Sequence, residues 1–159
     1  MTLKVLYEDS HIIAVYKPAG VLVQADKTGD ATLMDEVKYY LKQKYHKLGK
    51  VFLGLVHRLD RPVAGIIVFG KTSKGAERLS KQFRDHTIQK MYHALIVGQP
   101  PQARGTLVHY LKKDKNYNIV KAYDRPAAGA LKAELDYEIC VIDVSVGTGR
   151  DLSLLTRQL

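Results

Sequence analysis

Two short apolar runs that flank a highly charged loop constrain this chain more than any other feature of its sequence. The runs are Leu55-Val56 and Ile66 to Phe69, and the whole stretch reads GLVHRLDRPVAGIIVF. Apolar runs of this kind that contain β-branched residues predict buried strands. A loop between two such strands is a rigid place for chemistry. The stretch therefore predicts a strand, a functional loop and a second strand.

The loop carries one carboxylate, Asp60, together with the guanidiniums of Arg58 and Arg61 and the imidazole of His57. Neighbouring cations favour the ionised form of a carboxylate. The working hypothesis is that Asp60 is reactive, as a nucleophile or a base, and that the arginines keep it ionised. A structural Asp–Arg pair that satisfies a buried loop is the alternative, and the residues alone favour it.

The rest of the chain predicts an α+β fold. Strands outnumber helices and do not alternate regularly with them, which indicates a mostly antiparallel, mixed β-sheet with flanking helices. The length of 159 residues indicates a single domain over residues 1–159. The expected helices begin near Thr32 and after Gly70-Lys71-Thr72-Ser73. The expected strands cover residues 3–7, 11–17, 87–97, 106–111, 117–123 and 131–146.

The composition points to a polyanionic partner. There are 25 Lys and Arg against 16 Asp and Glu, a net charge of +9, which favours RNA or DNA over a role in solubility alone. The single cysteine, Cys140, excludes an internal disulfide and a Cys-based metal site, and the histidines show no metal-ligand spacing. No apolar run approaches the roughly 20 residues that span a bilayer. We expect a cytoplasmic, monomeric protein without a membrane partner.

Tyr92 is the second candidate for a functional side chain. It lies in an alternating stretch, Met91 to Val97, that predicts a strand. Core packing is the usual role of a strand tyrosine. A tyrosine held near a carboxylate can also stack on a base turned out of an RNA and move a proton.

Four segments in order resemble the RluA family of RNA pseudouridine synthases. The loop His57-Arg58-Leu59-Asp60-Arg61-Pro62-x-x-Gly65 is similar to the family's signature loop. The N-terminal segment that ends in Lys17-Pro18-Ala19-Gly20, the Lys71-Thr72-Ser73-Lys74 segment and the Tyr92-bearing strand are similar to three further family motifs. Together they cover about residues 5 to 98. The resemblance is to single-domain members, since no S4-type module precedes Tyr7.

The resemblance implies isomerisation of a uridine in 23S rRNA or tRNA to pseudouridine, without a metal or an organic cofactor. It implies that Asp60 is the catalytic carboxylate and that Tyr92 stacks on the uracil and serves in proton transfer. Arg58 would evict the uridine or hold the gap that it leaves. His57, Arg61 and Arg150 are the further expected substrate-binding residues.

The chain departs from the family pattern at two places. Val63-Ala64 stands where the family usually has small hydroxylated residues. Gly147-Thr148-Gly149-Arg150 resembles a family motif, but the His-Gln-Ile/Leu-Arg segment expected after it, whose arginine pairs with the catalytic aspartate, is replaced. We therefore expect a fold that is truncated or altered at the C-terminus and lacks the family's last strands. Arg157 is a candidate for the missing arginine, although its spacing is wrong.

Two other functions remain open at this point. A non-catalytic, basic RNA-binding remnant would keep the charged surface and make no product. An Asp-dependent glycosidase that acts on a small nucleoside would use the carboxylate but leaves the positive charge unexplained.

Overall fold

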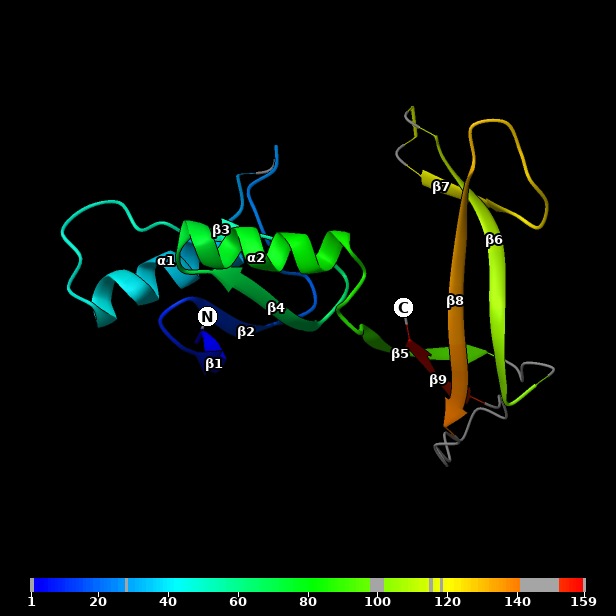
Figure 1. Cartoon of the computed structure of the whole chain (residues 1–159), viewed down its shortest axis with the longest axis horizontal. Helices are drawn as coiled ribbons and strands as arrows, with labels where there is room; N and C mark the ends of the chain where they lie inside the picture. Colours follow the sequence, from blue (N-terminus) through cyan, green and yellow to red (C-terminus); the bar gives the residue numbers. More distant parts are fainter. Residues whose placement is uncertain are drawn as a thin grey trace. The chain divides into compact units, whose positions relative to one another are not determined.

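The chain divides into two compact units. The computed structural model describes residues 2–27, 29–97, 102–114, 116–117, 119–140 and 152–158. Unit 1 is Met1–Ile88 and unit 2 is Gln89–Leu159 (Figure 1). Both contain an antiparallel sheet, and the two helices of the described residues belong to unit 1, so the α+β class is confirmed. That residues 1–159 form one domain stays a prediction.

Unit 1 is a four-stranded sheet with two helices. The strand order is β1-β2-β4-β3, and every neighbouring pair is antiparallel. The elements are β1 (Lys4–Glu8), β2 (Ile12–Lys17), α1 (Leu33–Lys44), β3 (Gly54–Leu55), β4 (Gly65–Gly70) and α2 (Ser73–Arg84). The strands predicted on either side of the charged loop are β3 and β4, and they pair directly.

The core of unit 1 lies between α1 and one face of the sheet. Alternate residues of β2 and β4 point into it, as the period of a strand requires. The spacing of apolar residues along α1 places its buried stripe against the same face. The fully or almost fully buried members are Ile13, Val15, Leu33, Val37, Leu41, Ile67 and Phe69.

Helix α2 packs on the opposite face of the sheet. Gly70 and Gly54 are partners in the β4–β3 pair. A Cβ on Gly70 would lie 2.5 Å from the backbone nitrogen of Ala76, and one on Gly54 would lie 2.4 Å from the Ala76 Cβ. Glycine at both positions therefore lets the backbone of α2 approach the sheet closely. A side chain at either position would push the helix outward.

Both helices are capped by a threonine, at Thr32 as expected and at Thr72 within the turn expected before the second helix. The Thr32 hydroxyl accepts from the Asp35 N–H at 3.2 Å and donates to the Asp35 carboxylate at 2.7 Å. The Thr72 hydroxyl accepts from the Gly75 N–H at 3.0 Å. The two bonds that these hydroxyls accept each satisfy one of the N–H groups that a helix leaves unpaired at its start.

Each helix is followed, two residues after its last residue, by a histidine in the left-handed conformation, with φ of 49° at His46 and 54° at His86. The next N–H in each case bonds back five residues, from Lys47 to Lys42 at 3.1 Å and from Thr87 to Gln82 at 3.1 Å. These are Schellman ends. Neither helix therefore uses a glycine at the left-handed position that ends it.

Unit 2 is a five-stranded antiparallel sheet with the order β5-β9-β8-β6-β7. Its strands are β5 (Met91–Val97), β6 (Arg104–Asp114), β7 (Ile119–Tyr123), β8 (Leu131–Cys140) and β9 (Leu152–Gln158). The strands expected over residues 106–111 and 117–123 correspond to β6 and β7, which pair antiparallel. The sequence predicted no element near the C-terminus, yet β9 pairs with both β5 and β8. The expected strand beyond residue 140 lies outside the described residues.

Within the described parts of the chain, neither helix has the length and apolar character needed to cross a membrane.

Candidate active site

Asp60 is presented to solvent from a loop whose backbone is anchored in the core. Leu59 packs against the core of unit 1, and Asp60, the next residue, is exposed. The Asp60 carbonyl accepts from the Val63 N–H at 3.0 Å, which closes a turn after the carboxylate. Gly65 lets Leu59 lie close, because a Cβ at Gly65 would be 3.0 Å from its Cδ1. Among the described residues, the Asp60 carboxylate has no hydrogen bond or ion pair.

A buried ammonium lies next to this loop. Lys17 has no exposed surface, and its Nζ donates to the carbonyls of Pro18 at 3.1 Å, Val21 at 2.8 Å and Arg61 at 3.1 Å. Burial lowers the pKa of Lys17, and the negative charge of Asp60 acts in the opposite direction. Lys17 therefore fixes the backbone one residue after Asp60, and its ammonium interacts electrostatically with the Asp60 carboxylate.

Arg61 fastens the loop to the turn after β2. Its Nε donates to the Gly20 carbonyl at 3.0 Å, and the Gly20 N–H donates back to the Arg61 carbonyl at 2.7 Å. Gly20 has a φ of +85°, which favours glycine at this position. The Arg61 Nη2 pairs with Asp30 at 2.9 Å. The guanidinium of Arg61 therefore bonds to Gly20 and Asp30, and within the described part of the chain no hydrogen bond or ion pair joins it to Asp60.

His57 and Arg58 differ sharply in their surroundings. The His57 Nε2 accepts from the Val68 N–H of β4 at 2.9 Å, and its ring stacks on Phe83 of α2 with centroids 4.6 Å apart. His57 thus fixes the start of the loop against a strand and a helix. Arg58 is exposed and makes no hydrogen bond or ion pair with a described residue. It is the more available of the two for a ligand.

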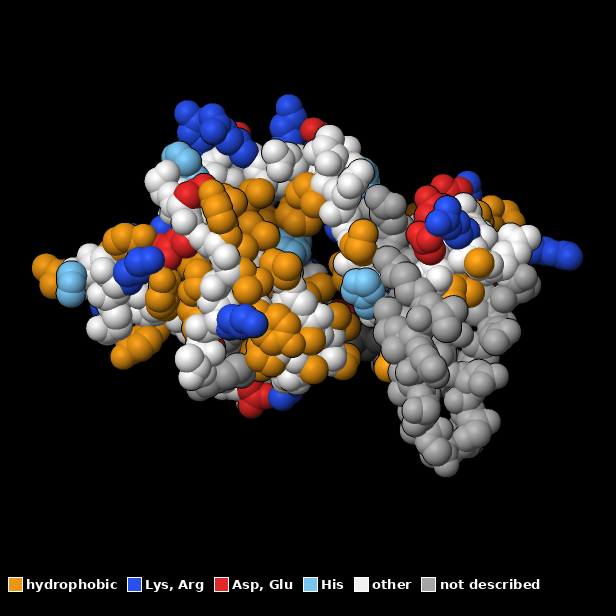
Figure 2. All heavy atoms as spheres, turned by 90° about the horizontal axis from the view of Figure 1, so that it is seen from below, with side chains coloured by type: hydrophobic (Ala, Val, Ile, Leu, Met, Phe, Trp, Pro, Cys, Tyr) orange, Lys and Arg blue, Asp and Glu red, His pale blue; other side chains and the backbone are white. Residues whose placement is uncertain are grey.

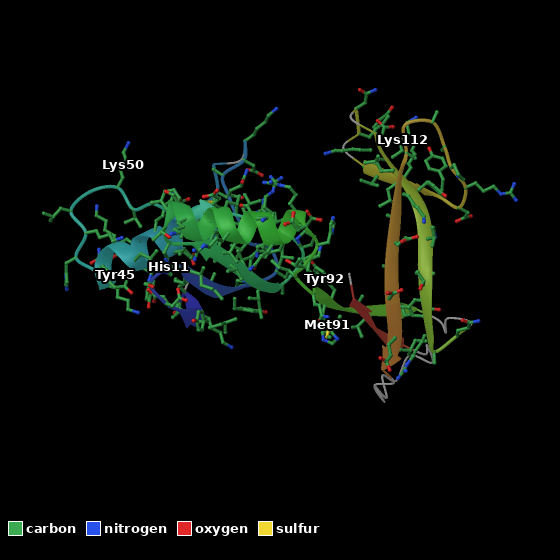
Figure 3. The ribbon with its side chains drawn as sticks, in the orientation of Figure 1. His11, Tyr45, Lys50, Met91, Tyr92 and Lys112 are labelled. Carbon is green, nitrogen blue, oxygen red and sulfur yellow. The ribbon has the colours of Figure 1, made fainter. Side chains whose placement is uncertain are left out.

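Tyr92 lies near the start of β5, in unit 2 (Figure 3). It is half-buried, whereas its neighbours Met91 and His93 are exposed, as the predicted alternation requires. Its register partner on β9 is Arg157, which is also the partner of Tyr137 on β8. The backbone therefore places Arg157 in the same row as Tyr92. Arg150 lies outside the described residues.

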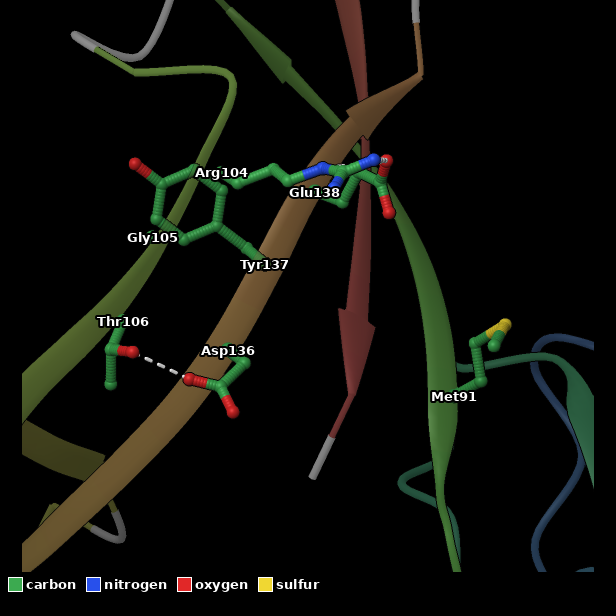
Figure 4. Close-up of a pocket in the computed structure, with 7 residues that line it drawn as sticks. All are labelled: Met91, Arg104, Gly105, Thr106, Asp136, Tyr137 and Glu138. Atoms are coloured by element: carbon green, nitrogen blue, oxygen red, sulfur yellow. Dashed lines mark hydrogen bonds and ion pairs between the residues drawn. The ribbon is translucent and has the colours of Figure 1, made fainter.

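Unit 2 also has a pocket of about 350 Å³ (Figure 4). Its polar side chains satisfy one another. Arg104 donates to Glu138 at 2.6 Å, and Thr106 donates to Asp136 at 2.6 Å. The charges of Arg104 and Glu138 are thus paired and the Asp136 carboxylate accepts from a hydroxyl, and we assign this pocket no chemistry.

From the sequence, Lys17 was expected at the end of a strand and no role in the interior was predicted for it, although a signal was present. Ile13, Val15 and Lys17 are spaced by two and therefore share one face of β2. Since the first two are core residues, the period alone directs the third into the interior. A lysine there must bond its ammonium to something buried, and the nearest acceptors are the carbonyls of adjacent turns.

Comparison with known proteins supports the resemblance of the motifs. The profile of a family described as RNA pseudouridylate synthase matches residues 11–143. The chain is 32% identical to an uncharacterised RNA pseudouridine synthase, MG370, of Mycoplasma genitalium, over 99% of this chain and 48% of that protein. It is 32% identical to tRNA pseudouridine synthase C of Yersinia pestis, over 93% of this chain and 55% of that protein.

Another relative is ribosomal large subunit pseudouridine synthase D of Zymomonas mobilis, 37% identical over 62% of this chain and 32% of that protein. These shares mean that the chain spans about a third to just over half of the length of these relatives. Among solved structures, the human RNA pseudouridylate synthase domain containing 4 superposes with a TM-score of 0.75 at 20% identity. That alignment covers 98% of this chain and 58% of the human chain, and it shows a shared fold.

Proposed function

We propose, since the chain belongs to the RNA pseudouridylate synthase family, that it converts a uridine of rRNA or tRNA into pseudouridine with Asp60 as the catalytic carboxylate. Relatives named for ribosomal RNA and for tRNA support both substrate classes equally. The net charge of +9 supports an RNA partner.

One observation carries the assignment of Asp60. Its carboxylate is exposed, while the backbone before and after it is fixed by the packed Leu59 and by the bonds to Arg61. A reactive group needs this combination, because access to substrate and a defined position are both required. The buried ammonium of Lys17 adds a second fixed contact to this backbone, because it donates to the Arg61 carbonyl at 3.1 Å.

The reaction is an isomerisation that consumes nothing. The bond between N1 of uracil and C1′ of ribose breaks, the uracil turns, and C5 bonds to C1′. C5 then releases its proton and N1 takes one up. Asp60 acts on the ribose, either as the nucleophile that holds C1′ while the base turns or as a base.

The other residues have supporting roles in this proposal. Tyr92 stacks on the uracil and serves in proton transfer. Arg58 occupies the gap left by the extruded nucleotide, whose unstacking costs a few kcal/mol. His57 and Arg61 position the loop through their contacts with Val68 and Gly20. Arg150 binds substrate.

The test is tritium release from rRNA and tRNA transcripts labelled at C5 of uridine. We expect release by the wild-type chain and a loss of at least about 10³-fold in Asp60→Asn. Glu77→Gln is the matched control, because it removes one carboxylate from the exposed face of α2. Absence of release by the wild-type chain, or retained release by Asp60→Asn, contradicts the proposal.

A further inference from the structure

The end of α1 and the loop that follows it form a groove away from the Asp60 loop. The groove has a volume of about 550 Å³. In Figure 3, Tyr45 lies at the end of α1 and Lys50 extends from the loop after it. The residues that line the groove are Lys38, Tyr39, Lys42, Leu48, Gly49, Lys50 and Val51.

The charge of the groove is positive and unbalanced. Lys38, Lys42 and Lys50 form no ion pair with a described residue. By contrast, the next lysine of α1, Lys44, is paired with Glu8 at 2.7 Å. The negative end of the helix dipole favours a lysine at position 42. It does not account for Lys38, which lies further from the helix end, or for Lys50 in the loop.

The groove also exposes apolar surface beside these charges. Leu48 is 100% exposed and Tyr39 is 67% exposed. Tyr39 makes no hydrogen bond or ring contact with a described residue. Tyr45 differs, because its hydroxyl donates to Glu8 at 2.7 Å and this bond fixes its side chain. Figure 2 shows hydrophobic, lysine and histidine side chains intermixed at this end of unit 1.

We propose that this groove binds RNA, with its three lysines on phosphates and Tyr39 stacked on an unpaired base. Lys38 and Lys42 are four residues apart and so share one face of the helix, next to Tyr39. Cations that follow a backbone, with an aromatic ring for a base, are the combination that binds single-stranded RNA. An acidic protein would use the lysines but has no need of the exposed ring. The proposal rests on the proposed function only in taking RNA as the partner.

The first test measures the affinity of the full chain for a fluorescent RNA hairpin with an unpaired loop, at several salt concentrations. For Lys38→Gln/Lys42→Gln/Lys50→Gln we expect at least tenfold weaker binding and a salt slope reduced by about 2. The control, Lys112→Gln/Lys121→Gln/Lys132→Gln, removes the same charge from lysines that already bond to Ala128, Asp114 and Glu134. Equal affinity and slope in the two triple variants overturn the proposal.

The second test isolates the ring. Tyr39→Ala should weaken binding of the hairpin about tenfold and leave binding of a fully paired duplex unchanged. Equal losses for the two RNAs, or none, overturn the stacking contact and favour a protein partner or a solvated face. Measurement of tritium release distinguishes failure of the proposed function from failure of the groove proposal. A wild-type chain that binds through the groove without releasing tritium contradicts only the proposed function, whereas release with no groove effect contradicts only the groove.

Discussion

Substitution of Lys17 tests how the backbone of the Asp60 loop is held in place. Methionine at this position removes the free-energy cost of burying a charge, but it leaves three carbonyls without their hydrogen-bond donor. Each buried acceptor that loses its partner costs about 1–3 kcal/mol. We expect Lys17→Met to lower the free energy of unfolding by about 2 kcal/mol, measured by urea denaturation.

Lys4→Met is the control for this prediction, because it makes the same chemical change at an exposed position of the neighbouring strand β1. A surface substitution of this kind should stay within about 0.5 kcal/mol of wild type. If Lys17→Met also stays in that range, the three bonds do not contribute to stability as proposed.

At the scale of single residues, the strand–loop–strand segment that presents Asp60 was predictable from the sequence, whereas the contacts of the loop's other side chains were not. Leu59 packs against the core and Asp60 is exposed, as expected for an apolar and a charged side chain. The partner of Arg61 was not predictable, because Asp30 lies 31 residues away in a polar loop and nothing local distinguishes it from Asp60. The role of His57 depends on Phe83, which a different element brings to it.

At the scale of elements, helix starts were predictable because they use local chemistry. Thr32 and Thr72 each bond to a group three residues on, and the caps need no tertiary contact. Helix ends were not predictable from the sequence, because a histidine occupies the left-handed position at which helices usually have a glycine. Strand β9 was missed for a related reason. Its apolar run is short, and it is defined by its place between β5 and β8.

The histidine ends give a prediction about stability. A left-handed conformation strains a residue with a Cβ and does not strain glycine. We expect His46→Gly and His86→Gly each to raise the free energy of unfolding by about 0.5–1 kcal/mol, measured by denaturant titration. Asp85→Gly is the control, since Asp85 has a φ of −80°. Glycine there should be destabilising, and a gain in all three variants would contradict the explanation by left-handed strain.

At the scale of the whole chain, one buried carboxylate ties together three segments of unit 1. Glu8 of β1 accepts from Lys44 at 2.7 Å and Tyr45 at 2.7 Å, at the end of α1, and from Lys71 at 2.6 Å, between β4 and α2. Its side chain is 7% exposed. These contacts join the helix that bears the proposed RNA groove to the sheet that holds the Asp60 loop.

This cluster makes the stability of the chain depend on pH. Burial raises the pKa of Glu8, but the hydrogen bonds from Lys44, Lys71, Tyr45 and Tyr40 outweigh it and lower the pKa to about 2. A carboxyl group whose pKa is lower in the folded state stabilises the fold above its unfolded pKa. That stabilisation is lost as the pH falls from about 4.5 to about 2. The full stabilisation from this difference in the pKa of Glu8 is about 3 kcal/mol.

Glu8→Gln should therefore destabilise the chain by about 3 kcal/mol at pH 7, with a difference from wild type that shrinks steadily below about pH 4.5. Urea denaturation between pH 3 and pH 7 measures that difference, and Glu77→Gln, on the exposed face of α2, should show almost none. A difference that stays constant with pH would mean that Glu8 acts through packing and not through its charge. RNA binding at the groove should weaken over the same acidic range in wild type, because protonation of Glu8 weakens the contacts that hold the end of α1 to β1.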